Sequence, residues 1–439
     1  MELEPGFKLS EAGPIPKDWE AKTIGELAAN VRNAIVGGPF GSDLTAEDYR
    51  SHGVPVIRGS NLHGRYVQGP FVYVSTEKGK ALEANLARPG DVVFTQRGTL
   101  GQVALVPFGE HEAYLVSQSQ MKVSLNAGLA CNEFIVQVFN HPEYKRKVIA
   151  SAIQTGVPHL NLSILRGYVI PRPTVEEQKA IARALSDIDT WIVDAESEVS
   201  KLASVKAAAM NALLTRTTHL PGFFGEWERV RLGDLGTLRK GRGITRSEVR
   251  ATGIPVIRYG ELYTRFDSHI RQFYSYVSAE SAQGALRLQW GDICFAASGE
   301  TADEIGKCAA VLHDGPCFAG GDIIVLSLHR DDPTFLGYLL NTPVIAEQKA
   351  RLGQGDAVVH IHADKLAELE LHLPNVSEQQ AIATLLSDID AALATARAVV
   401  AKARGVKAAA MDALLSGRVR LPPFGPAAQR TPNATLEFA

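Results

Sequence analysis

Apolar residues recur at alternating steps of four and three positions along two stretches of the chain, and the residues between them are mostly polar. Such a heptad pattern is typical of a long helix that buries one stripe against a partner helix. The positions in the stripe are Ile181, Leu185, Ile188, Ile192, Ala195, Val199 and Leu202 in the first stretch, and Ile382, Leu386, Ile389, Leu393, Ala396, Val400 and Ala403 in the second. Val205 and Val406 then come three residues later, which marks a stammer in both copies.

The two stretches are copies of one another. Glu177–Leu214 aligns without a gap on Glu378–Leu415, more than half of the positions are identical, and the strings LSDID and KAAAM occur in both. Pro173 and Pro374 precede the copies, so we expect a helix of about 40 residues to follow each proline, roughly 60 Å long if unbroken. An antiparallel pairing of the two copies would bury both stripes, although a coiled coil with another protein would do so too.

The segments before the helices repeat more loosely and read as short β-branched strands bounded by glycine. GVPVIRGSNL at 53–62 matches GIPVIRYGEL at 253–262, and PGDVVF at 89–94 matches WGDICF at 290–295. We therefore expect a mixed α/β (α+β) fold with a pseudo-twofold repeat. The predicted division is a first globular domain (1–173), a helix (174–216), a second globular domain (217–374), a second helix (375–416) and a disordered tail (417–439).

The composition mainly excludes certain classes of protein. The 439 residues include four cysteines and carry a formal net charge of −3. There is no apolar run long enough for a membrane span and no signal-peptide pattern at the start, so we expect a cytoplasmic protein without a disulfide framework.

The sequence contains only partial matches to known catalytic and metal-binding motifs. His360 and His362 could lie on one strand face, but no third ligand follows at a typical spacing, and they are more simply structural. No nucleophile triad, carboxylate pair or nucleotide-binding loop stands out. The chain is expected to hold no metal, no cofactor and no catalytic residue.

Basic and amide side chains gather in the variable segments of both globular domains. Arginine and lysine can neutralise DNA phosphates, and arginine and glutamine can also pair with base edges in the major groove. The candidate DNA-binding residues are Arg58, Arg65, Arg97, Gln118 and Gln120 in the first domain, and Arg239, Lys240, Arg242, Arg246, Arg258 and Tyr259 in the second. Each one taken singly is more simply an ordinary surface residue, and it is the set as a whole that favours contact with DNA.

The order of these elements resembles the specificity subunit of type I restriction–modification systems. The resemblance covers the chain except its tail and rests on the repeated GxPVIR strands, the GDVVF-type strands, QRGTLGQVALV at 96–106, SGETADEIGKCAAV at 298–311 and the Glu-Gln opening of each helix. It implies two target recognition domains that each read half of a split DNA sequence, with the paired helices as a spacer.

The same resemblance implies the partners. They would be double-stranded DNA, two modification subunits that bind S-adenosylmethionine and methylate adenine at N6, and restriction subunits that use ATP and Mg²⁺. Two alternatives remain, a two-lobed coiled-coil scaffold that binds only proteins and a methyltransferase in its own right.

Overall fold

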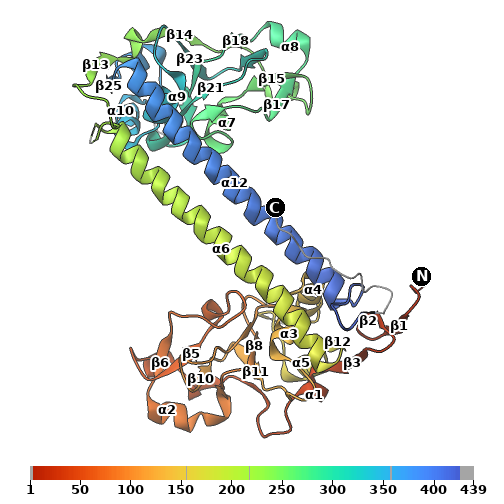
Figure 1. Ribbon diagram of the computed structural model, residues 1–439. Coiled ribbons are helices and arrows are strands. Elements are labelled where there is room, and N and C mark those ends of the chain that lie inside the picture. The colour runs from red at the N-terminus through yellow and green to blue at the C-terminus, as the bar shows by residue number, and fades with distance from the viewer. Residues whose placement is uncertain (1–2, 155, 217, 356–357, 426–439) are drawn as a thin grey trace. The chain divides into compact units, whose positions relative to one another are not determined.

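The computed structural model describes residues 3–154, 156–216, 218–355 and 358–425 (Figure 1). The chain forms two compact units, Met1–Ala195 with Val399–Ala439, and Glu196–Ala398. Each unit therefore contains one globular body and half of each long helix. This grouping differs from the linear division expected from the sequence, because the helices return the chain to the first unit.

The first unit has two four-stranded sheets, ordered β6-β5-β10-β7 and β4-β11-β8-β9, and two separate strand pairs, β1-β2 and β12-β3. Its strands are β1 (Phe7–Ser10), β2 (Gly13–Pro16), β3 (Glu20–Thr23), β4 (Ile35–Gly37), β5 (Val54–Ile57), β6 (Val72–Val74), β7 (Leu86–Ala87), β8 (Val92–Thr95), β9 (Val103–Leu105), β10 (Tyr114–Val116), β11 (Gln120–Val123) and β12 (Val169–Arg172). Its short helices are α1 (Ile24–Leu27), α2 (Thr76–Ala81), α3 (Asn132–Asn140), α4 (Pro142–Ala150) and α5 (Leu162–Gly167).

The second unit repeats this plan with sheets ordered β17-β15-β22-β18 and β14-β23-β19-β21-β16, and with the pairs β13-β25 and β20-β24. Its strands are β13 (Glu228–Arg231), β14 (Gly236–Lys240), β15 (Ile254–Ile257), β16 (His269–Ile270), β17 (Ser275–Val277), β18 (Leu286–Leu288), β19 (Ile293–Ala296), β20 (Ser298–Gly299), β21 (Cys308–Val311), β22 (Cys317–Ala319), β23 (Ile323–Leu328), β24 (Val359–His360) and β25 (Glu370–Leu373). Its short helices are α7 (Tyr259–Thr264), α8 (Ala279–Gln283), α9 (Pro333–Leu339), α10 (Pro343–Leu352) and α11 (Ala363–Ala367).

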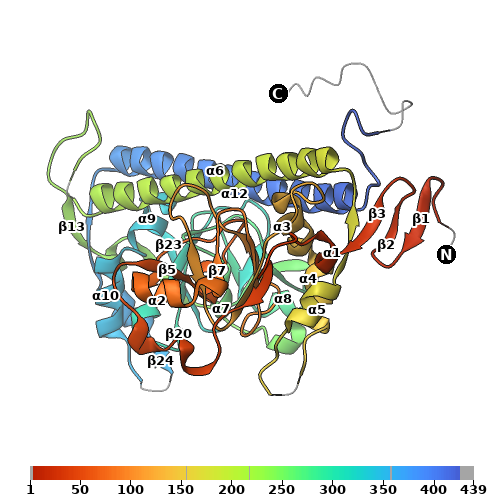
Figure 2. The ribbon, with the colours of Figure 1, turned by 90° about the horizontal axis from the view of Figure 1, so that it is seen from below.

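The two long helices are α6 (Val175–Leu214) and α12 (Val376–Leu415). In both units they lie side by side and run in opposite directions, as Figures 1 and 2 show. The predicted fold class, a mixed α/β fold with a paired antiparallel repeat, is confirmed.

The stripe residues serve two interfaces. Ile181 and Leu185 belong to the core of the first unit, together with Leu414 and Leu415 from the end of α12. In the second unit, Ile382 and Leu386 share a core with Leu213 and Leu214 from the end of α6. Farther along, Leu393 and Val400 are buried, whereas Ile188, Ile192, Val199 and Ile389 are half-buried. The start of each helix thus anchors a body as well as the partner helix.

The segment after α12 corrects one expectation. Residues 418–425 were expected to be part of a disordered tail, but Arg420 pairs with Glu177 and Leu421 packs on the core of the first unit. An apolar side chain and a charge that finds a buried partner are enough to fix this segment. The rest of the expected tail, 426–439, lies outside the described residues.

Candidate nucleic-acid interface and helix anchors

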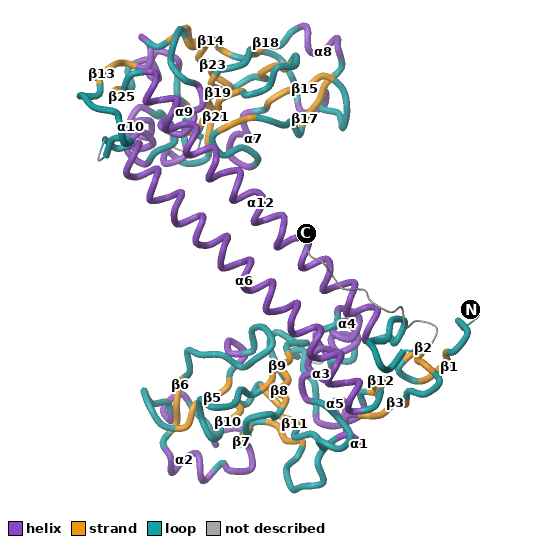
Figure 3. Tube along the Cα trace, in the orientation of Figure 1, coloured by secondary structure: helices purple, strands orange, loops and turns teal. Residues whose placement is uncertain are grey.

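A buried aspartate, Asp91 in the first body and Asp292 in the second, directly precedes β8 and β19. Figure 3 labels both strands. Asp91 Oδ2 accepts the backbone N–H of Arg88 at 2.9 Å, and Asp292 Oδ2 accepts that of Gln289 at 2.9 Å. The balancing cation comes from different strands. It is Lys122 of β11 in the first unit, at 3.4 Å, and Arg239 of β14 in the second, at 3.5 Å. The two bodies therefore share the buried aspartate, although the cation that neutralises its carboxylate comes from a different strand in each.

A second shared feature is a close backbone approach at the end of β4 and β14. Gly38 N–H donates to the Gln120 carbonyl at 2.9 Å, and Gly241 N–H donates to the Ile323 carbonyl at 2.8 Å. A Cβ on Gly38 would lie 1.9 Å from the Ser117 carbonyl oxygen, and one on Gly241 would lie 2.1 Å from that of Gly320. Only glycine fits at either position.

The chemistry displayed on this frame differs between the units. After the shared glycine the first unit continues with Pro-Phe-Gly at 39–41, where the second has Arg-Gly-Ile at 242–244. The turn that packs against this loop is Ser-Gln-Ser at 117–119 in the first unit and Gly-Gly-Asp at 320–322 in the second. The same surface is therefore apolar and amide-rich in one body and basic in the other.

Two of the candidates in the first unit lie together. Arg97 is exposed, and it lines one cavity with Gln118. Gln118 Nε2 donates to the carbonyls of Gly41 and Leu44, at 2.7 and 2.8 Å, so that side chain supports a loop and leaves only its oxygen free to bind a ligand.

Three further candidates in the first unit lie elsewhere. Gln120 is fully buried with its oxygen bonded to Ser117, so its assignment as a base reader is corrected. All four residues of β11 are buried, and the strand lies between β4 and β8 in its sheet. Arg58 is half-buried, and Arg65, whose guanidinium lies 4.9 Å from the Tyr66 ring, lines a different groove from that of Arg97.

In the second unit some candidate side chains are exposed and others are paired with a carboxylate. The exposed ones are Lys240, Arg242, Arg246 and Tyr259. Arg239 donates to Ser327 Oγ at 2.7 Å beside Asp292, and Arg258 donates to Ser275 Oγ at 3.1 Å beside Glu261. Arg239 and Arg258 each balance a buried carboxylate and so have a supporting role, while their contact with DNA stays a prediction.

The glutamate that opens each long helix is an anchor. Arg420 forms two bonds of 2.7 Å to the Glu177 carboxylate, which also accepts the Trp19 indole N–H at 3.2 Å. These contacts and Asp18 raise the pKa of Arg420 despite its partial burial. At the equivalent place in the second unit His219 contacts Glu378 at 2.8 Å. Each long helix therefore begins at a buried carboxylate held by the segment that follows the other helix.

The glutamine next to each glutamate ties the helix to its body. Gln178 accepts the backbone N–H of Cys131 at 2.8 Å, and Gln379 accepts that of Asp332 at 3.0 Å. Cys131 and Asp332 directly precede α3 and the proline that opens α9, respectively. The Glu-Gln opening is thus a structural joint.

The repeated strings LSDID and KAAAM meet across the helix pair. Lys407 of the second KAAAM pairs with Asp189 of the first LSDID, and Lys206 of the first KAAAM lies 2.7 Å from Asp390 of the second LSDID. Burial lowers the pKa of Lys206, but Asp390 and Asp267 outweigh it, so the net shift is upward. The two pairs are related by the repeat, which explains why both strings are present twice.

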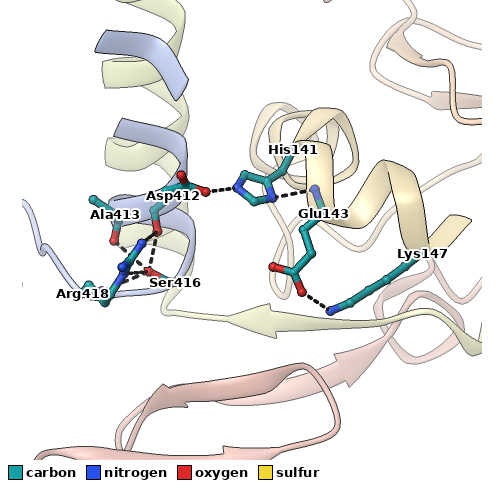
Figure 4. A network of polar contacts seen from close by, with 7 residues as sticks. All are labelled: His141, Glu143, Lys147, Asp412, Ala413, Ser416 and Arg418. Carbon is teal, nitrogen blue, oxygen red and sulfur yellow. Dashed lines mark hydrogen bonds and ion pairs between the residues drawn. The ribbon is translucent and has the colours of Figure 1, made fainter. Parts of the chain in front are cut away.

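A polar network holds the end of α12 to α4 (Figure 4). His141 Nε2 lies 2.6 Å from Asp412 Oδ1, and its Nδ1 faces the backbone N–H of Glu143 at 3.3 Å. Arg418 and Ser416 bind the Asp412 carbonyl at 3.1 and 2.5 Å and so cap the last turn. The first body is fixed to the start of α6 and to the end of α12.

Grooves of different charge lie where each long helix starts. The first, of about 470 Å³, is lined by Arg65, Lys179 and Arg183 with Glu133, and the second, of about 650 Å³, by Asp314, Asp332 and Asp388 with Arg271. Several apolar side chains on the helices are also exposed. They are Trp191, Val193 and Val205 on α6, and Leu385, Val399 and Val406 on α12.

The described part of the chain has no cluster of three or more His, Cys, Asp or Glu suited to a metal, and His360 Nδ1 instead lies 3.0 Å from Ser298 Oγ. None of the helices within the described ranges is long and apolar enough to cross a membrane. The four cysteines are buried and free.

The family model described as "Type I restriction modification DNA specificity domain" matches residues 16–203 and again 225–401. Two proteins of Methanocaldococcus jannaschii are similar over nearly the whole chain. The type I restriction enzyme MjaVIII specificity subunit is 25% identical and the putative MjaX specificity subunit is also 25% identical, each over 95% of this chain and 97% of the relative.

Two solved structures share the fold. The S subunit of the type I system of M. genitalium aligns with a TM-score of 0.58 and 16% identity, over 94% of this chain and 99% of the other. A chain from a structure on complex assembly and conformational transition of the type I R-M system aligns with a TM-score of 0.53 and 19% identity, over 92% and 99%.

Proposed function

The chain belongs to the family of type I restriction–modification DNA specificity proteins, and we propose that it reads a bipartite DNA sequence, one half with each globular body. One observation carries this proposal. The two bodies share a backbone frame down to single glycines, yet Pro39 and Phe40 stand where the other body has Arg242 and Gly243. A rigid frame with exchanged surface chemistry suits two bodies that recognise different sequences.

The helices would set the distance between the half-sites. Removing one heptad from each helix, Val193–Val199 and Ala394–Val400, keeps both Lys–Asp pairs and shortens each helix by about 10 Å. At about 3.4 Å per base pair, we expect the tolerated gap to fall by roughly three base pairs. An unchanged gap between the half-sites would contradict the spacer role of the helices.

The helix pair would also dock two copies of one modification subunit. Val205 and Val406 are equivalent in the repeat and are 53% and 42% exposed, so each unit offers the same apolar contact once. These two valines are proposed as docking positions because the repeat places one of them in each unit. Restriction subunits would join the same complex, and S-adenosylmethionine, ATP and Mg²⁺ would bind to the partners.

The docking proposal is tested by Val205→Glu and Val406→Glu, made singly and together. We expect native mass spectrometry to show one modification subunit for each single variant and none for the double variant. Val31→Glu, a change at another exposed valine, should leave two modification subunits bound. Retention of two subunits by the double variant would contradict this docking surface.

The DNA-recognition proposal is tested by mapping N6-methyladenine in host genomes with and without the gene. We expect one bipartite motif to lose methylation, and binding by the complex to fall steeply between about 50 and 200 mM salt. Binding that is salt-insensitive and blind to sequence would favour the protein-only scaffold. Methyl transfer by the isolated chain would instead make it an enzyme.

A further inference from the structure

A cavity of about 580 Å³ opens between loops of the first body, beside the shared glycine turn. It has an aromatic side chain at its rim and amides and a guanidinium along its wall. The lining side chains used below are Phe40, Asn85, Gln96, Arg97 and Gln118.

Phe40 is 83% exposed. The loop around it is fixed on both sides. Gln118 Nε2 donates to the Gly41 and Leu44 carbonyls at 2.7 and 2.8 Å, and Asn85 Nδ2 donates to the Gly37 carbonyl at 2.7 Å. The frame therefore presents an apolar side chain to solvent in one defined place.

Gln96 lies directly beside this loop. A Cβ on Gly37 would be 3.3 Å from Gln96 Oε1, which places the amide at the base of the segment that carries Phe40. Within the described part of the chain the side-chain amide of Gln96 makes no hydrogen bond. A half-buried amide without a protein partner is ready to bind a ligand.

We propose that Phe40 and Gln96 together read one A·T base pair in the half-site bound by the first body. This inference rests on the proposed DNA-recognition function. In the major groove adenine offers N6 and N7 to a glutamine amide, and the paired thymine offers its C5 methyl to an apolar side chain. One A·T pair thus satisfies both adjacent residues, whereas a G·C pair offers no methyl group.

The second body lacks this pair of residues. Gly243 occupies the place of Phe40, and Ala297 follows its strand where Gln96 follows β8. Ala297 is buried, so no side chain of either kind faces solvent at that position. The proposal therefore predicts the A·T reader in one half-site only.

The test uses the full chain with its modification subunit and duplexes that carry the mapped target. Each thymine is replaced in turn by uracil, which removes only the C5 methyl. We expect about a fivefold loss of wild-type affinity at one thymine, within the range for a single base contact. Phe40→Ala should lose the same factor on the normal target and become insensitive to uracil at that position alone.

Two further variants and a control sharpen the result. Gln96→Ala should relax the requirement for adenine at the same base pair, and Phe40→Leu should keep the response to the methyl. Phe108→Ala, at another exposed phenylalanine of this unit, should behave as wild type.

A Phe40→Ala variant as sensitive to every uracil as wild type would overturn the inference, as would Phe40 and Gln96 effects on different base pairs or a target without any methyl-sensitive thymine. In each case sequence-specific binding by the wild-type complex would leave the proposed function intact. Loss of all sequence preference in the wild type would refute both.

Discussion

The two units use the same joints but different surfaces. Glu177 and Glu378 open the long helices, and both carboxylates are buried at 1% exposure, yet Arg420 holds the first with two bonds and His219 holds the second with one. In the loop after the shared glycine, Phe40 of the first unit and Gly243 of the second are at equivalent positions. The two units therefore keep the buried carboxylates and the glycine turn, whereas the cations that balance the carboxylates and the residues on the exposed loops differ.

The largest effect is expected at the shared glycines. Gly38→Ala and Gly241→Ala each force a Cβ into a backbone carbonyl, so each should destabilise its own unit by about 3 kcal/mol. Urea unfolding measures the loss. Gly167→Ala and Gly260→Ala, where nothing lies within 4 Å of the added atom, serve as controls. A tolerated alanine at only one of the two shared positions would break the equivalence of the frames.

The anchors should show an effect of similar size. Arg420→Ala leaves the Glu177 carboxylate buried with one remaining indole donor, which should cost about 3 kcal/mol. His219→Ala leaves the equally buried Glu378 carboxylate without its side-chain partner, so it should also cost about 3 kcal/mol. Thermal or urea unfolding measures both losses, with Arg420→Lys as the conservative control. A loss below about 1 kcal/mol for either alanine variant would contradict the anchor role.

The reciprocal ion pairs should be weaker and alike. Both pairs are partly exposed, so double-mutant cycles on Lys407 with Asp189 and on Lys206 with Asp390 should each give about 1 kcal/mol. The exposed i,i+4 pair of Lys22 with Glu26 serves as a reference and should couple more weakly than either cross-helix pair. Coupling in only one of the two cross-helix pairs would show that the helix repeat is not functionally symmetric.

The smallest effect is expected from exposed cations of the second body. Lys240→Gln and Arg242→Gln should each lower the slope of log affinity against log salt by about one, with an affinity loss of a few fold. Arg239→Gln should instead reduce stability, because it uncovers Asp292. Lys201→Gln on α6 is the control. An unchanged slope for both loop variants would place the DNA elsewhere.

The sequence predicted the two halves, the long helices to within two residues at each end and the glycine-bounded strands, because periodicity and repeats are local patterns. It did not reveal that LSDID contacts KAAAM, since that contact depends on the helices running antiparallel. Arg239 looked like a free cation because its partner, Asp292, lies on a distant stretch of the chain. Gln120 looked exposed because the sequence does not show that β11 is an interior strand with both faces covered. Phe40 was missed because only a folded loop shows that it faces outward. An aromatic residue within a run of glycines was the one available signal.

One exchange tests the central claim most directly. Replacing residues 16–173 by 225–374 gives a chain with the second body in both places, and its target is read by mapping N6-methyladenine in the host. The account predicts a symmetric target, an inverted repeat of the half-site belonging to the second body. An unchanged asymmetric target from this folded chain would contradict the assignment of one half-site to each body.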